Sequence, residues 1–162
     1  MAEATLRRLG SAGDLGWVVL AHGELYRAEY GWDTSFEALV ARIVAGYATT
    51  HDPHREAAWI AEIDGRRIGC VFCVAADDDG TAKLRLLLVH PDARGLGLGA
   101  RLVEACTDFA RTAGYHRLTL WTNDVLTAAR HIYQAAGFRL VAEEHHHSFG
   151  HDLTGQTWTL DL

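Results

Sequence analysis

Several residue types are scarce in this chain of 162 residues, which has three cysteines, two prolines, one methionine and a single lysine, Lys83. Three cysteines cannot form an even disulfide framework. Cys70 and Cys73 form a C-x-x-C, but in a strand residues three apart point to opposite faces, which disfavours a redox or zinc pair. We predict that both are core residues.

Long hydrophobic runs are missing too. No apolar run approaches the ~20 residues that a membrane-spanning helix needs, and the opening MAEATLRRLGSAGDLG contains no segment typical of a signal peptide. A formal net charge of −6 disfavours binding to nucleic acids or acidic membrane surfaces. We therefore expect a cytoplasmic protein with neither kind of partner. The length and the 49% hydrophobic content fit one domain over residues 1–162.

The hydrophobic pattern predicts strands and helices in an irregular alternation. Strands are expected at 4–9, 57–63, 67–75, 83–89, 117–122, 138–147 and 156–162, and helices at 15–31, 36–50, 98–113 and 125–136. The acidic turn at 77–80 is interpreted as a solvated hairpin tip, because no calcium ligands follow at the required spacing. This order implies a mixed α/β sheet with helices on both faces.

The segment LVHPDARGLGLGARLVE at residues 88–104 is the most informative part of the chain. An apolar strand ends at Pro91, and a glycine-rich turn containing Arg94, Gly97 and Gly99 leads directly into a helix. Glycines let the backbone approach a ligand and point several N–H groups one way. The helix N-terminus adds a partial positive charge. The segment therefore predicts a phosphate or pyrophosphate site.

Two motifs carry a resemblance to a known family. Arg94, Gly97 and Gly99 match the Q/R-x-x-G-x-G/A acetyl-CoA signature of GNAT (Gcn5-related) N-acetyltransferases. A second block of this family is matched by Asn123, Ala129, Tyr133, Gly137 and Phe138. The chain resembles the family along nearly its full length, and most of all the acetyltransferase half of MarR–GNAT fusion proteins. The resemblance implies the GNAT fold: a mostly antiparallel central sheet with a splayed parallel strand pair and helices on both faces.

The resemblance also implies acetyl-CoA as the cosubstrate and no metal. In the family, loop N–H groups hold the pyrophosphate, and the splayed strand pairs with the pantetheine arm like an added strand. The residues expected to bind the cofactor are Leu88, Val89, Arg94, Gly95, Leu96, Gly97, Leu98, Gly99, Ala100, Asn123, Ala129 and Tyr133.

Two groups are expected to be catalytic. Tyr133 would be the general acid that protonates the departing thiolate, and the backbone N–H of Leu87 or Leu88 would polarise the thioester carbonyl. Tyr133 also fits a buried core tyrosine, since it lies on an apolar helical stripe. Asn123 fits the N-cap of the helix at 125–136, a cofactor contact, or both.

The general base stays open. Several family members have a glutamate at a position that falls here at Lys83, with Arg85 nearby, and neither is a base at neutral pH. Glu29, His147, His151, water, or an amine that arrives already neutral are the alternatives. His145 and His147 share one strand face, so the run offers two metal ligands at most and is interpreted as a polar strand. His22 and the other scattered histidines are assigned structural or surface roles.

The acceptor site is expected among aromatic residues of the first two helices and the last hairpin. Its candidate residues are Tyr26, Glu29, Tyr30, Trp32, Trp121 and His147. Glu24 and Glu29 beside these aromatics would favour a cationic amine, although solvated carboxylates are the more common case.

We predict direct transfer of an acetyl group to a primary amine in a ternary complex, because no cysteine is placed as an acyl carrier. The acceptor is expected to be a small molecule. A peptide or protein amine, and a non-catalytic acyl-CoA sensor, are the alternatives. Family members are often dimers, so a homodimer is also expected.

Overall fold

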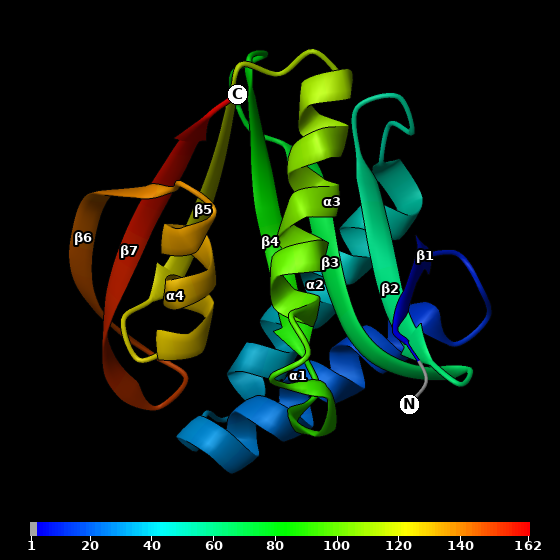
Figure 1. Ribbon diagram of the computed structural model, residues 1–162. Helices are drawn as coiled ribbons and strands as arrows, with labels where there is room; N and C mark the ends of the chain where they lie inside the picture. Colours follow the sequence, from blue (N-terminus) through cyan, green and yellow to red (C-terminus); the bar gives the residue numbers. More distant parts are fainter. Residues whose placement is uncertain (1–2) are drawn as a thin grey trace.

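Residues 3–162, the part of the chain that the computed structural model describes, form a seven-stranded sheet in the order β1-β2-β3-β4-β5-β7-β6 (Figure 1). The strands are β1 (Thr5–Arg8), β2 (Ala57–Ile63), β3 (Arg66–Ala75), β4 (Thr81–Val89), β5 (Arg117–Asn123), β6 (Arg139–Ser148) and β7 (His151–Asp161). β4 and β5 are parallel, and the other neighbours are antiparallel. The predicted mixed α/β sheet is confirmed. Met1 and Ala2, which belong to the segment inspected for a signal peptide, lie outside the described residues.

Helices cover both faces of the sheet. They are α1 (Asp14–Tyr30), α2 (Thr34–Thr50), α3 (Leu98–Thr112) and α4 (Thr127–Ala135), with a short 3-10 turn η1 (Pro91–Ala93). In Figure 1, α3 and α4 lie in front of the sheet, and α1 and α2 lie behind it. Two apolar cores result, one on each face. Within residues 3–162, no helix is long and apolar enough to cross a membrane.

Helix α3 shows why the front layer forms. Leu98, Leu102, Val103, Cys106 and Ala110 are buried at helical spacing and pack on β2, β3 and β4. Each fully buried leucine or valine stabilises the fold by roughly 1.5–3 kcal/mol. The three cysteines are buried and unpaired, as expected for core residues.

The end of β4 departs from regular sheet geometry on both edges. Residues Thr81–Lys83 pair with Arg117–Thr119 of β5, and the ladder stops there. On the β3 side, the register shifts between the pairs Phe72–Arg85 and Cys70–Leu88, and Leu86 has a left-handed φ of 54°. Such a bulge bends and twists a strand. It turns the last residues of β4 away from β5, which confirms the expected splayed pair.

The start of β7 differs most from the sequence-based expectation. β7 begins at His151 rather than at residue 156, because Phe149 and Gly150, with φ of 58° and 84°, form a tight two-residue turn. Gly155 lies inside β7, where a Cβ would come within 2.5 Å of the Trp121 ring. The packing of Trp121 thus explains a glycine that interrupts the strand pattern.

The fourth helix begins at Thr127, two residues later than expected. Leu126 precedes it without a side-chain cap. The N-cap alternative for Asn123 is therefore wrong: its side chain lies 2.7 Å from Nε2 of His146 on β6 instead. The register of β6 thus decides what this asparagine contacts.

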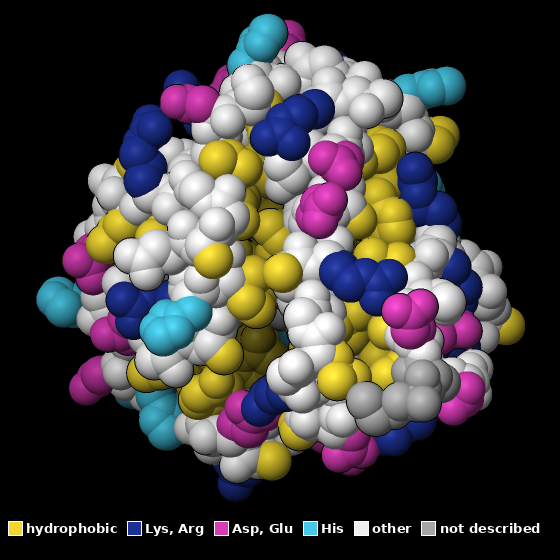
Figure 2. Space-filling view, in the orientation of Figure 1, with side chains coloured by type: hydrophobic (Ala, Val, Ile, Leu, Met, Phe, Trp, Pro, Cys, Tyr) yellow, Lys and Arg dark blue, Asp and Glu magenta, His cyan; other side chains and the backbone are white. Residues whose placement is uncertain are grey.

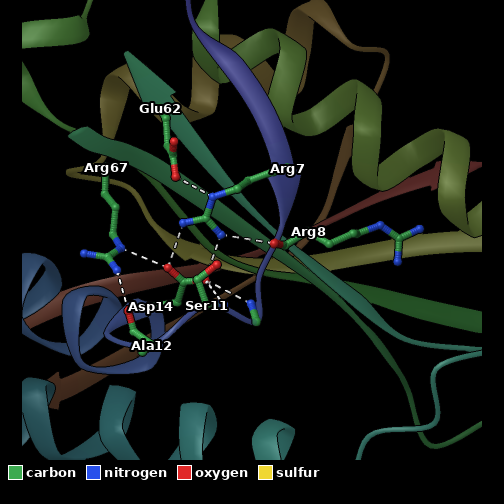
Figure 3. Close-up of polar contacts among 8 residues, drawn as sticks. Arg7, Arg8, Ser11, Ala12, Asp14, Glu62 and Arg67 are labelled. Atoms are coloured by element: carbon green, nitrogen blue, oxygen red, sulfur yellow. Dashed lines mark hydrogen bonds and ion pairs between the residues drawn. The ribbon is translucent and has the colours of Figure 1, made fainter. Parts of the chain in front are cut away.

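A buried carboxylate joins the start of α1 to the sheet (Figure 3). Asp14 is fully buried and accepts hydrogen bonds from Arg7 of β1, Arg67 of β3, and the backbone N–H groups of Gly10 and Ser11. We call this set of contacts the Asp14 network. The hydrogen bonds from Arg7, the largest cause, keep the pKa of Asp14 well below its usual range.

Candidate functional site

A cleft of about 500 Å³ opens where β4 leaves the sheet. Its walls come from Leu87–Val89 of β4, the loop and first turn of α3 at residues 93–100, Leu25–Tyr30 of α1, and Thr127–Ile132 of α4. We call it the glycine-loop cleft. Figure 2 shows it as a hollow with an apolar floor between α4 and α3.

The loop at the mouth of this cleft is built to receive an anion. Gly95 and Gly97 have φ of 83° and 72°, a conformation that costs other residues energy. The backbone N–H groups from Gly95 to Ala100 donate no hydrogen bond to any described residue. Free N–H groups at a helix start attract phosphate groups. The residues present therefore fit a pyrophosphate.

Arg94 and Glu29 form an ion pair across the mouth of the cleft. Arg94 comes from the loop and Glu29 from the last turns of α1. Both side chains are accessible to solvent, so the pair contributes little to stability. It places the guanidinium beside the free N–H groups, where it can meet a second phosphate oxygen.

A second cavity of about 330 Å³ adjoins the first, and both are lined by Tyr26, Leu87 and Leu126. It lies between the splayed β4 and β5, with α1 and α2 on one side. Its aromatic lining residues are Tyr26, Trp32, Phe36, Trp121, Tyr133 and Phe149. We call it the aromatic cavity. The shared residues mean that a group extending along β4 can reach either space.

Tyr133 lies on α4 and lines the aromatic cavity. Its side chain is 5% exposed, and its hydroxyl forms no hydrogen bond with any of residues 3–162. Burial raises the pKa of Tyr133 well above its ordinary value. The phenol is therefore fully protonated at neutral pH and has a proton to donate.

His22 is a site residue that the sequence reasoning missed. It lies on α1, is 1% exposed and lines the aromatic cavity. Its Nδ1 is 2.7 Å from the carbonyl oxygen of Val18, and its Nε2 has no hydrogen-bond partner among the described residues. Burial lowers the pKa of His22 to about 4, so the ring is neutral at neutral pH. No spacing in the sequence separates it from a structural histidine.

The structure places most of the predicted site residues in these two spaces. Of the expected cofactor residues, Leu88, Val89, Arg94, Gly95, Gly97, Leu98, Gly99, Ala100 and Ala129 line the glycine-loop cleft together with Leu87. Asn123 and Tyr133 line the aromatic cavity instead, and Leu96 points to solvent with 49% exposure. Arg94, Gly97 and Gly99 of the first motif thus line the glycine-loop cleft, and Asn123 and Tyr133 of the second motif line the aromatic cavity.

The expected acceptor residues divide between the two spaces. Tyr26 lines both, Trp32 and Trp121 line the aromatic cavity, and Tyr30 and Glu29 line the glycine-loop cleft. His147 lines neither, because it is exposed on β6 and pairs with Asp152. Glu29 therefore lies with Tyr26 and Tyr30 in the glycine-loop cleft, where it also pairs with Arg94, and its role toward an acceptor stays a prediction.

Metal binding finds no support in the geometry. Among residues 3–162, no three His, Cys, Asp or Glu side chains gather as ligands. His145, His146 and His147 contact Thr154, Asn123 and Asp152 respectively. These contacts fit the polar-strand interpretation of the histidine run.

The features described fit an enzyme that binds a diphosphate-bearing donor beside an acceptor. They are a splayed parallel strand pair, a loop of free N–H groups at a helix start, and an adjoining cavity with a protonated phenol. A family model described as "Acetyltransferase (GNAT) family" matches residues 20–138 of the chain. The chain therefore belongs to this family. It is therefore an N-acetyltransferase that uses acetyl-CoA.

The chain is similar to several known acetyltransferases. An uncharacterized N-acetyltransferase of Schizosaccharomyces pombe is 27% identical over 121 residues, which is 75% of this chain and 74% of the yeast protein. The N-acetylaspartate synthetase of Danio rerio is 34% identical over 85 residues, covering 52% of this chain but 30% of the fish protein. The second match thus spans less than a third of its relative.

Solved structures share the fold at low sequence identity. The yncA acetyltransferase from Salmonella typhimurium, solved with acetyl-CoA, superposes with a TM-score of 0.78 at 18% identity, covering 99% of this chain and 94% of that one. The ribosomal-protein-alanine N-acetyltransferase from Brucella melitensis gives 0.77 at 17% identity, covering 98% and 99%. These likenesses establish the fold alone.

Proposed function

We propose that the protein transfers the acetyl group of acetyl-CoA directly to the amine of a small molecule in a ternary complex. The observation that carries this proposal is the pair of adjoining spaces, which meet at Leu87 and Tyr26. A donor and an acceptor occupy separate spaces, and their reacting ends share one border. Holding both reactants in one geometry removes much of the entropy cost of their encounter.

The donor site uses the backbone more than side chains. The free N–H groups from Gly95 to Ala100, with Arg94, hold the pyrophosphate, and the unpaired edge of β4 beyond Lys83 receives the pantetheine arm. Acetyl-CoA supplies an acetyl thioester at the end of that arm. The backbone N–H of Leu87 or Leu88 donates to the thioester carbonyl oxygen and stabilises the negative charge that develops there.

Two proton transfers accompany the reaction in the aromatic cavity, one to the sulfur and one from the amine. As the acceptor nitrogen forms its bond to the acetyl carbon, the carbon–sulfur bond breaks, and Tyr133 donates its proton to the sulfur. The proposed bases Glu29, His147 and His151 do not line this cavity. In the proposal the amine therefore enters in its neutral form, and water accepts the proton that its nitrogen loses on forming the amide. That proton returns through water to the Tyr133 phenolate, which restores the phenol.

The size of the aromatic cavity favours a small acceptor. A volume of about 330 Å³ lies at the lower end of the range for ligand pockets. The N-acetylaspartate synthetases, named for a small product, support the same choice. The Brucella structural neighbour is named for a protein acceptor, so a peptide amine is the alternative to be tested. A cytoplasmic location, one domain over residues 1–162 and a homodimer stay predictions.

Release of free thiol from acetyl-CoA across a panel of small amines and short peptides tests the proposal. We expect turnover with small amines and an initial-rate pattern in which both substrates bind before any product leaves. Turnover with peptides alone would favour the alternative acceptor. Tight binding of acetyl-CoA without turnover of any amine would contradict an enzymatic role of this site.

A further inference from the structure

The charge of the aromatic cavity is unbalanced. Lys83 and Arg85 line it from β4, whereas no aspartate or glutamate of residues 3–162 does. Because side chains two apart in a strand share a face, both cations point to the side of β4 that carries α1 and α2. Within residues 3–162, the lining of the aromatic cavity therefore carries two positive charges and no negative one.

Neither cation has a partner within the described part of the chain. Lys83 and Arg85 form no ion pair and no side-chain hydrogen bond there, although most other arginines do. Arg85 is exposed at the opening of the cavity, although desolvation by the surrounding protein still lowers its pKa. A cation in that position gains from a bound anion, because a charge-assisted pair restores the interactions that desolvation removed.

The two carboxylates expected to favour a cationic acceptor, Glu24 and Glu29, do not line the aromatic cavity. Glu29 pairs with Arg94 at the other space, and Glu24 is exposed on α1 outside both linings. A second positive charge on the acceptor would therefore face Lys83 and Arg85 without compensation, and like charges disfavour binding. The cavity selects against a polyamine.

On these observations, and resting on the proposed acetyl transfer, we propose that the acceptor is an amine that also carries a carboxylate. Its carboxylate lies against Arg85 and Lys83, and its amine nitrogen points toward the border with the glycine-loop cleft at Leu87. The planar guanidinium of Arg85 suits a carboxylate in two-point contact. The volume of about 330 Å³ is ample for an amino acid.

The test compares common amino acids with their own α-amides in the thiol-release assay. Each pair differs by one negative charge at nearly constant shape. We expect kcat/KM to be at least about tenfold higher for the acid of the preferred pair, the gain of a charge-assisted contact over a neutral one. The amine of the amide is the less basic of the two, so its greater neutral fraction biases the comparison against the proposal.

A charge-removing variant assigns the effect to the cavity. Arg85→Gln is expected to reduce the acid-to-amide ratio toward one, mainly through KM for the acid, and Lys83→Gln to reduce it less. Arg42→Gln, which removes an exposed arginine from α2 outside both spaces, is the matched control and should keep the ratio. An amide as good as its acid, or equal losses for both in Arg85→Gln, would overturn the proposal.

Failure of acetyl transfer and failure of the anionic acceptor give different results. Turnover of amides or simple amines without preference for acids supports acetyl transfer and contradicts the anionic acceptor. If no amine is turned over, acetyl transfer fails, and calorimetric titration of the acetyl-CoA-loaded protein with each acid and amide still decides the question of charge. Equal binding of acid and amide in that titration would also count against the proposal.

Discussion

Two regions of the molecule treat buried polar groups in opposite ways. In the Asp14 network, one fully buried carboxylate receives hydrogen bonds from two arginines and two backbone N–H groups (Figure 3). In the aromatic cavity, His22 Nε2 and the Tyr133 hydroxyl have no partner among residues 3–162. Both regions are built from residues of α1 and of the same sheet.

An unpartnered buried polar group costs free energy, roughly 1–3 kcal/mol for a neutral one. Proteins keep few such groups, and a ligand that completes the contact is one explanation for them. The Asp14 network is complete without a ligand, so it acts on folding. The polar groups of the aromatic cavity lack such partners, so we expect them to act on binding and chemistry.

The largest effect is expected from breaking the Asp14 network. Asp14→Asn removes the charge that compensates Arg7 and Arg67, and loss of one partner of a buried pair costs about 3–5 kcal/mol. Chemical denaturation should show this loss of unfolding free energy. Thiol release per folded molecule should remain close to wild type, because the network lies outside both spaces.

The matched control for this variant is Asp92→Asn. Asp92 pairs with Arg66, and both side chains are more than half exposed. An exposed pair contributes about 0–1 kcal/mol. If the two variants lost the same unfolding free energy, the distinction between a completed buried network and a surface pair would fail.

A smaller effect is expected from pH, through His22. Its folded pKa of about 4 lies below the ordinary 6.5, so between these values the unfolded chain binds the proton more readily. The contribution of neutral His22 to the unfolding free energy is therefore complete above pH 6.5. It falls as the pH drops and levels off near pH 4, after a loss of about 3 kcal/mol. His22→Gln should flatten this part of the stability profile. An unchanged slope between pH 6.5 and 4 would show that the imidazole is not held neutral.

Much of the fold was predictable because its signals are local. The apolar spacing of α3 and the glycines that end helices act within a few residues, and both were found. The Leu86 bulge depends on the register of β4 against β3. The early start of β7 depends on the turn at Phe149, whose ring packs on Trp32 and Phe36, far away in the sequence. Spacing alone does not encode those partners.

The site was predictable where a backbone motif builds it. The glycine-rich turn is visible in the sequence, and Gly95 and Gly97 adopt the left-handed conformations that glycine allows. The acceptor space was less accessible to sequence reasoning, because His22, Lys83 and Arg85 meet there only after β4 bends away from β5. Charge balance within a cavity is a property of the folded surface, and our proposal of an acceptor with a carboxylate rests on it.

The comparison is sharpest when one chemical change is made in both kinds of environment. Tyr133→Phe removes a hydroxyl that has no partner, so we expect an unfolding free energy equal to or above that of wild type. Turnover should fall about a hundredfold, within the range for a proton donor, with acetyl-CoA affinity kept. Tyr115→Phe removes a buried hydroxyl that donates to the Arg55 carbonyl at 2.8 Å, so it should cost about 1 kcal/mol of stability and leave turnover unchanged. Steady-state kinetics and denaturation of both variants give four measurements. A Tyr133→Phe enzyme with wild-type turnover would make Tyr133 a core residue, and the phenol would then have no part in the chemistry.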